Sequence, residues 1–141
     1  MPRLVGINHV AVEVADVDEA VAFFERIFDQ VALRGRSRGA AFVDLGDQFV
    51  ALEAAEKPVA VGHYGLVVDD RVETMRRAQN AGARVIGRND FRDPSGNHWQ
   101  IVDYRDVQFT KTDRILEGMR LAGLEKSQRA LDELRGKGLA D

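Results

Sequence analysis

The sequence of 141 residues contains no cysteine. Disulfide bonds, thiolate metal ligands and cysteine nucleophiles are therefore excluded together. A basic surplus is also lacking, because acidic residues outnumber lysine and arginine and the net charge is −3. Without a basic surface the chain has little to hold a phosphate backbone, so we expect no nucleic-acid partner.

Long apolar runs are absent as well. No stretch approaches the roughly 18 residues that a membrane span requires, and residues 1–8 lack the apolar segment of a signal peptide. We therefore expect no membrane partner and a cytoplasmic location. What is present, 45% hydrophobic and 30% charged residues, is typical of a globular domain of ordinary size.

A repeated pattern runs through most of the chain. Residues 5–14 alternate as a strand does, and a helix with an apolar stripe follows the N-cap candidate Asp16. The same pattern restarts at residue 61. Placing His63 beneath His9 also places Asp70 beneath Asp16. A repeat at a constant offset indicates two copies of one structural unit.

Each copy has the order strand, helix, strand, strand, strand, so we predict an α+β fold. It consists of two repeated β-α-β-β-β modules that form a curled mixed sheet around a cavity. The modules span about residues 5–56 and 60–104 of a single domain at 1–106. A C-terminal extension, 107–141, is expected to form two short helices, at 113–122 and 124–134, divided by a glycine.

Four side chains lie on the strand faces opposite to the valine-rich sides. If a helix covers the outer face of each sheet, these inner faces oppose each other across the cavity. The four side chains belong to the first and last strands of the modules: His9, Glu53, His63 and Gln100. Imidazole, carboxylate and amide oxygen ligate Zn²⁺, Ni²⁺, Co²⁺, Mn²⁺ or Fe²⁺, so the pattern predicts a divalent-metal site. The simpler interpretations are that the histidines lie on a hydrated sheet face, that the glutamate lies at the rim of the cavity, and that the glutamine lines the cavity.

Other polar residues have simpler interpretations. Glu13 is expected to be a solvated residue at the rim of the cavity, and His98 to be a surface histidine whose alternative role is a contact at the rim or with a substrate. The basic loop with Arg34, Arg36 and Arg38 is expected to be solvated, and its functional interpretation is a clamp for an anionic substrate.

Four stretches resemble a known group of proteins. They are INHVAVEVADVDEAVAFFERIF, GDQFVALE, GHYGLVVDD and DPSGNHWQIVD. They resemble the vicinal-oxygen-chelate superfamily, which includes glyoxalase I, extradiol dioxygenases, fosfomycin-resistance transferases and bleomycin-binding proteins. The resemblance implies paired modules around an open cavity, often a homodimer, and metal ligands at His9, Glu53, His63 and Gln100. The last-strand ligand is usually glutamate in such proteins, so Gln100 leaves Glu53 as the sole metal-bound catalytic base.

Two functions follow from the resemblance. The first is a metal-dependent isomerase or lyase, in which the ion chelates two adjacent oxygens of a small substrate and Glu53 moves a proton. The alternative is a metal-free small-molecule binding protein of the bleomycin-resistance type, which Gln100 favours and the low aromatic content of 7% disfavours. A third, weaker interpretation is a scaffold that uses the C-terminal helices. The substrate, the metal and the pairing of modules within one chain or between two remain open.

Overall fold

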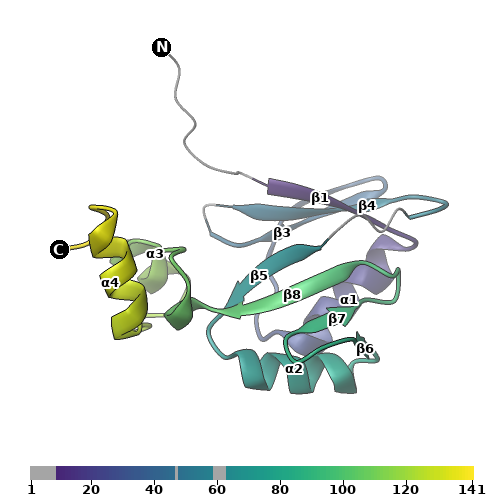
Figure 1. The fold of residues 1–141 in the computed structure, drawn as a ribbon. Helices are drawn as coiled ribbons and strands as arrows, with labels where there is room; N and C mark the ends of the chain where they lie inside the picture. The colour runs from purple at the N-terminus through teal and green to yellow at the C-terminus, as the bar shows by residue number, and fades with distance from the viewer. Residues whose placement is uncertain (1–8, 47, 59–62) are drawn as a thin grey trace, which may run out of the picture.

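The computed structural model describes residues 9–46, 48–58 and 63–141. Its described part has two four-stranded mixed sheets (Figure 1). In each sheet a helix connects the first strand to the second along the chain, and further helices follow the second sheet. The α+β fold with two repeated modules and a C-terminal helical extension is confirmed.

Sheet A contains the first module. Its strands are ordered β1-β4-β3-β2, with β1 parallel to β4 and the other neighbours antiparallel. The elements are β1 (His9–Val14), α1 (Val17–Ile27), β2 (Leu33–Ser37), β3 (Ala40–Asp44) and β4 (Phe49–Ala54). Residues 5–8 of the predicted first strand lie outside the described residues.

Sheet B repeats this arrangement as β5-β8-β7-β6, with β5 parallel to β8. The elements are β5 (Tyr64–Val68), α2 (Arg71–Asn80), β6 (Arg84–Val85), β7 (Asp90–Arg92) and β8 (His98–Asp103). Asp16 and Asp70 cap the two helices in the same way, since each carboxylate accepts from a backbone N–H three residues later at 2.9 Å. The two copies inferred from the sequence are therefore confirmed at matched positions.

The core lies between the helix-covered faces of the two sheets. The ring of Phe23 in α1 is 6.1 Å from that of Phe91 in β7, and the ring of Phe24 is 5.5 Å from that of Trp99 in β8. The valine-rich faces therefore point toward each other, and the faces predicted to carry ligands point outward. The expectation that the ligand-bearing faces oppose each other within the chain is wrong.

The composition of the two helices explains this packing. Five residues of α1 are buried, two of them phenylalanine, whereas α2 buries only Thr74 and Ala78. Alone, α2 cannot cover the large apolar side chains of sheet B. Packing α1 between the sheets removes more apolar surface from water than leaving each module with its own helix.

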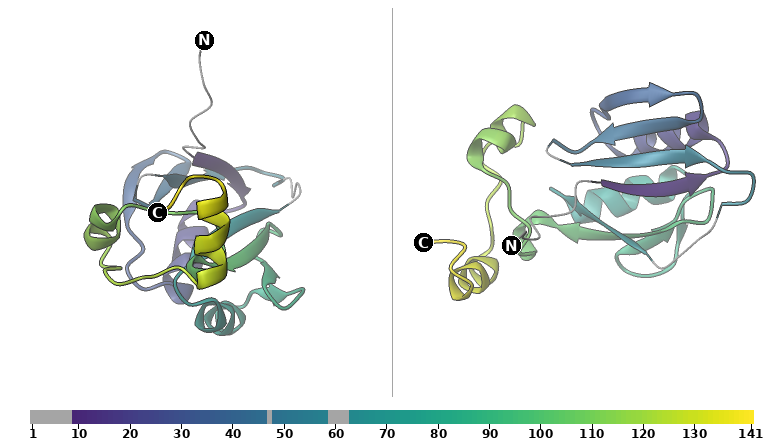
Figure 2. Two further views of the ribbon diagram at one scale, coloured as in Figure 1. Left: turned by 60° about the vertical axis from the view of Figure 1, so that its left-hand side comes forward. Right: turned by 90° about the horizontal axis from the view of Figure 1, so that it is seen from above.

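The extension follows β8 through a 3-10 turn, η1 (Tyr104–Asp106), and contains α3 (Asp113–Gly118) and α4 (Gln128–Gly136). Both helices lie at one end of the molecule, beyond the strands (Figure 2). They are shorter than predicted. Helix α3 ends because Arg120 takes a left-handed φ of 61°, and Leu121 N–H then bonds the carbonyl of Leu116.

Lys126 attaches the extension to the domain. Its Nζ donates to the backbone oxygens of Tyr104 at 2.5 Å and Val107 at 3.0 Å, and also to that of Phe109. Nζ lies 3.4 Å from the centre of the Tyr104 ring. Burial lowers the pKa of Lys126 to about 8, against the opposing charge of Asp103. The lysine thus gathers three carbonyls of the connecting segment around one cation.

No helix in the described residues is both long and apolar enough to cross a membrane. The cytoplasmic location expected from the sequence stays a prediction.

Candidate functional site

The register of sheet A separates the two ligands predicted in the first module. His9 pairs with Phe49, and Glu53 pairs with Glu13 at the other end of the parallel strands. Four residue steps along a strand correspond to about 13 Å. The ring of His9 stacks on that of Phe49 at 4.5 Å, while Glu53 is exposed. One metal ion cannot be ligated by both side chains in this arrangement.

The second module brings its two predicted ligands closer. Tyr64 pairs with Trp99, and the rings of the preceding residues, His63 and His98, lie 5.3 Å apart. Gln100 follows His98 by two residues, on the same outward face, and pairs with Gly65. His63 and Gln100 are therefore neighbours across two strands, as the sequence pattern predicts.

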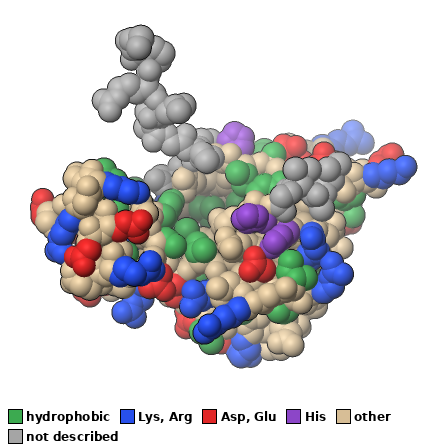
Figure 3. Space-filling model, in the orientation of Figure 1, with side chains coloured by type: hydrophobic (Ala, Val, Ile, Leu, Met, Phe, Trp, Pro, Cys, Tyr) green, Lys and Arg blue, Asp and Glu red, His purple; other side chains and the backbone are tan. Residues whose placement is uncertain are grey.

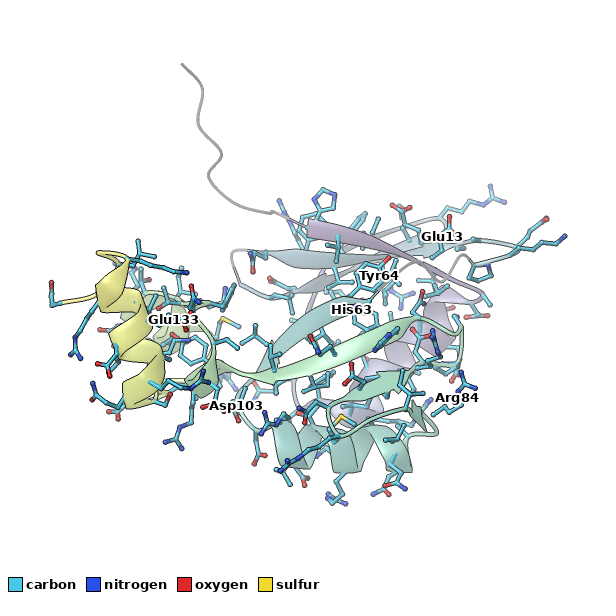
Figure 4. All side chains as sticks on the ribbon, in the orientation of Figure 1. Glu13, His63, Tyr64, Arg84, Asp103 and Glu133 are labelled. Atoms are coloured by element: carbon cyan, nitrogen blue, oxygen red, sulfur yellow. The ribbon has the colours of Figure 1, made fainter. Side chains whose placement is uncertain are left out.

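The two modules do not share these ligands within one chain. The histidine side chains occupy two separate places on the surface (Figure 3), and Figure 4 shows Glu13 on sheet A and His63 on sheet B on different faces. In the part of the chain that the structure describes, no three His, Cys, Asp or Glu side chains group as a metal site. The set His9, Glu53, His63 and Gln100 thus does not fit one ion in the single chain. Between two chains, a site of His63 and Gln100 with either His9 or Glu53 of the partner stays a prediction.

The strand register also corrects the match between the modules. His63, His98 and Gln100 of sheet B correspond to His9, Phe49 and Ala51 of sheet A. The residue equivalent to Gln100 is therefore Ala51, and not Glu53. The sequence pattern could not show this, because strand parity is the same for Ala51 and Glu53 and only the pairing separates them.

A cavity that the sequence did not reveal lies at one end of the core. It has a volume of about 420 Å³ and is bounded by the first residues of β1 and β4, by β5 and by the extension. Its walls are mainly apolar, and include Val10, Phe49, Val50, Tyr64, Leu66, Trp99, Leu116, Met119, Leu121 and Leu124. Polar atoms come chiefly from His9, Gln48, His63, Asp69 and Lys111.

The extension forms one wall of this partly open cavity. Its apolar side chains continue the lining made by the core faces of the two sheets. The turn after β3 approaches the extension so closely that a Cβ on Gly46 would lie 2.9 Å from Met119 Sδ, and Gly46 has a φ of 93°. Only glycine satisfies both the close approach and the left-handed backbone. The apolar spacing of residues 116–124 was the one available signal of this wall.

A polar cluster lies on the outward face of sheet B. His98 Nε2 is 2.9 Å from Asp90 Oδ1, and both side chains are about three-quarters buried, with exposures of 23% and 25%. Arg92 pairs with His98 across the ladder, and its Nη1 donates to the carbonyl of Gly96 at 2.9 Å. The sequence suggested a rim position for His98 and no role for Asp90.

The predicted arginine clamp is spread out in the structure. The Arg34 guanidinium lies 4.9 Å from the centre of the Phe49 ring, and Arg36 bonds Asp18 at 2.5 Å. Arg38 is exposed in the turn between β2 and β3. The three side chains therefore have separate surroundings, and the clamp stays a prediction.

Comparison with protein families gives one decisive match. A family described as "Glyoxalase-like domain" matches residues 9–102, which includes both modules. The chain belongs to this glyoxalase-like family. The resemblance to the vicinal-oxygen-chelate superfamily is thereby confirmed. The match ends before the extension, so the cavity wall that the extension forms lies outside the region shared with the family.

Solved structures support the glyoxalase-like fold. An integron cassette protein from Vibrio cholerae has a TM-score of 0.60 at 17% identity, covering 74% of this chain and 98% of its own. The fosfomycin resistance protein FosX from Mesorhizobium loti has 0.57 at 22%, covering 70% and 92%. A bleomycin resistance determinant encoded on transposon Tn5 has 0.55 at 18%, covering 70% and 98%. At these identities the likeness shows the fold alone. No curated protein sequence matches the chain.

Proposed function

We propose that this glyoxalase-like protein binds a small, mainly apolar molecule in the cavity beneath the extension. The observation that carries the proposal is the cavity itself. Its volume of about 420 Å³ lies within the usual range for small-molecule sites, roughly 300–1,000 Å³. Its lining is apolar, with a few polar groups at the border, which is the usual composition of such sites.

The chemistry of the lining indicates the class of ligand. Aliphatic side chains of the extension and the aromatic rings of Tyr64 and Trp99 favour an apolar or aromatic body. His63 and Lys111 are positioned at the cavity to orient a polar or anionic group of the same molecule. The likeness to a bleomycin resistance determinant agrees with binding as the function, although it concerns the fold.

The single tryptophan of the sequence provides the test. Because Trp99 lines the cavity, an occupant should change its fluorescence. We expect 1-anilinonaphthalene-8-sulfonate, as an apolar anionic probe, to bind saturably, with energy transfer from Trp99. Leu124→Glu places a charge in the apolar wall and should weaken binding at least about tenfold, because an unpaired charge resists burial.

Leu139→Glu is the matched control, since Leu139 is exposed and is not part of the cavity lining. It should bind the probe as the unchanged protein does. Equal binding by both variants, or a signal that never saturates, would contradict the cavity proposal.

A metal-dependent isomerase or lyase is the second candidate. His63 and Gln100 share one face, and His63 also borders the cavity, which favours it. An ion such as Ni²⁺, Zn²⁺, Co²⁺, Mn²⁺ or Fe²⁺ would supply Lewis-acid stabilisation to a substrate with two adjacent oxygens. Since His9 and Glu53 lie on another face and are too far apart to share one ion, we propose a homodimer in which one of them, from the sheet A face of one chain, joins His63 and Gln100 on the sheet B face of its partner.

Light scattering and metal analysis test this second candidate. The shared site predicts a dimer mass, near-stoichiometric metal in tag-free protein, loss of that metal in His63→Ala, and loss in one of His9→Ala and Glu53→Ala but not in both. Retention of metal by Glu53→Ala would remove Glu53 as the metal-bound catalytic base.

A further inference from the structure

We propose that the outward face of sheet B binds a phosphate group between the guanidinium groups of Arg84 and Arg92. The inference goes beyond the proposed function, because neither arginine lines the cavity. Three observations carry it: the pairing of the strands that hold the two arginines, the lack of a counter-charge for Arg84, and the different residues at the equivalent positions of sheet A.

The first observation is that two cations lie directly opposite each other across β6 and β7. Arg84 pairs with Arg92, and Arg92 pairs in turn with His98 on β8. The alternate residues Phe91 and Trp99 are buried in the core, so the row of Arg84, Arg92 and His98 faces outward. Opposed side chains in an antiparallel pair have Cβ atoms about 4.5–5.5 Å apart, and like charges at this spacing destabilise a sheet. An anion between the two guanidinium groups replaces this repulsion by attraction.

The second observation is that no carboxylate neutralises Arg84. In the part of the chain that the structure describes, its exposed side chain forms no ion pair and donates no hydrogen bond. Asp90 is the only acidic residue on the outward face of β6, β7 and β8, and its Oδ1 lies 2.9 Å from His98 Nε2. Arg92 donates through Nη1 to the Gly96 carbonyl at 2.9 Å, and its other N–H groups are available to an anion.

The chemistry of the two side chains indicates the class of anion. A guanidinium group is a planar fork of donors that matches two oxygen atoms of a phosphate. Two such forks at neighbouring positions favour a dianion with several oxygen atoms over a carboxylate, which has one charge and two oxygens. Figure 3 shows Lys or Arg side chains (blue) beside two adjoining histidine side chains (purple) on the near face. Figure 4 shows Arg84 at the end of the molecule away from α4, so the site is separate from the extension.

Sheet A has no such pair of cations, although its strands are arranged in the same way. Its positions equivalent to the outward row of sheet B follow from the register of β3 and β4 and from the bond between β2 and β3, and they hold Ala32, Asp44 and Phe49. An aspartate at the middle position repels an anion, so the site belongs to the second module. Arg38, exposed in the turn between β2 and β3, therefore provides a control with the same charge on sheet A.

Calorimetric titration of the full-length protein with sodium phosphate tests the site, with sodium acetate at matched ionic strength for comparison. We expect saturable binding of one phosphate per chain, at least about tenfold tighter than acetate. Arg84→Gln is the principal variant, because its side chain has no bond within the described residues to lose. It should weaken phosphate binding at least about tenfold, as is usual when a hydrogen bond between charged groups is removed. Arg38→Gln should bind phosphate as the unchanged protein does.

Melting temperatures give a second readout that a merely structural arginine would not produce. In phosphate-free buffer, Arg84→Gln should melt no lower than the unchanged protein, because it removes the opposition of like charges. Phosphate should raise the melting temperature of the unchanged protein and of Arg38→Gln, but not that of Arg84→Gln. Phenyl phosphate binding more tightly than inorganic phosphate would identify an organic phosphate ester as the ligand, and weaker binding would identify the ion itself.

The proposal is overturned if Arg84→Gln binds phosphate as tightly as Arg38→Gln, or if acetate binds as tightly as phosphate. A lower melting temperature of Arg84→Gln in phosphate-free buffer would also overturn it, because Arg84 would then stabilise the sheet without an anion. The dye experiment on Leu124→Glu uses a site that contains neither arginine, so failure of the phosphate site and failure of the cavity proposal are separate results.

Discussion

At the scale of single residues, Lys126 has a greater structural role than its place in a charged tail suggests. It is bonded to three backbone carbonyls and lies over the Tyr104 ring, and Tyr104 also lines the cavity. Removing the amine leaves those carbonyls without their donor. A part-buried acceptor left unpaired costs about 1–3 kcal/mol.

We therefore expect Lys126→Met to loosen the extension while the sheets remain folded. Hydrogen exchange should become faster in residues 107–136 and stay unchanged in β4 and β8. Lys137→Met is the control, because Lys137 is exposed and its amine donates to the side chain of Gln108 and not to the connecting carbonyls. Uniformly faster exchange over the whole chain would show that Lys126 stabilises the domain instead of its attachment.

We expect the stability of the fold to depend on pH in the acidic range through Glu73. Hydrogen bonds from Arg76, and then from Arg77, lower the pKa of Glu73 from 4.5 to about 2. A lowered folded-state pKa stabilises the fold fully above about pH 4.5, and the contribution is lost as the pH falls toward 2. Urea unfolding should show the advantage of the unchanged protein over Glu73→Gln shrinking across this range. The advantage is small because the pair is exposed; a difference that does not vary with pH would contradict the ion-pair explanation.

At the scale of elements, the two modules have equivalent N-cap residues at the start of their helices. Asp16 and Asp70 each accept one backbone N–H at the start of a helix, and both helices have a glutamate three residues after the cap. Helix α1 is also held by five buried residues, whereas α2 has only two. The cap of α2 therefore contributes a larger share of the stability of its helix.

We expect Asp16→Ala and Asp70→Ala each to lower the free energy of unfolding by about 1 kcal/mol. Denaturation in urea followed by circular dichroism measures this. Amide exchange should accelerate more in α2 of the second variant than in α1 of the first. Glu25→Ala, an exposed change within α1, is the control and should have little effect. Equal losses in the control would show that the caps are not the cause.

At the scale of the whole molecule, the extension completes the cavity although the family match ends at residue 102. The predicted domain boundary after residue 106 has a direct test. A chain ending at Asp106 retains both sheets but exposes Tyr104 and opens the cavity. We expect it to fold with a lower melting temperature and to lose the Trp99 response to the dye. A chain that does not fold would move the domain boundary into the extension.

Local features of this protein were determined by the sequence itself. The repeat, the order of the elements, the two aspartate caps and the left-handed Gly82 after α2 depend on residues that are close along the chain. The two helices of the extension were predicted, but the first was drawn too long, because it ends where Arg120 adopts a left-handed conformation, and the second begins four residues later and ends two residues later than predicted. The sequence likewise indicated that the side chains of His63, His98 and Gln100 lie on one face, because successive side chains of a strand alternate between faces.

The tertiary structure alone decided which faces meet. Each sheet has two faces, and a strand pattern does not say which of them packs on the other module. The apolar surplus of α1 and the polar character of α2 settled this, because burying α1 between both sheets removes the most apolar surface from water. That packing turned His9 and Glu53 away from the second module. It also left an apolar cavity at the end of the core, beside which the extension forms a further wall, and left His63, His98 and Asp90 together on the outward face of sheet B.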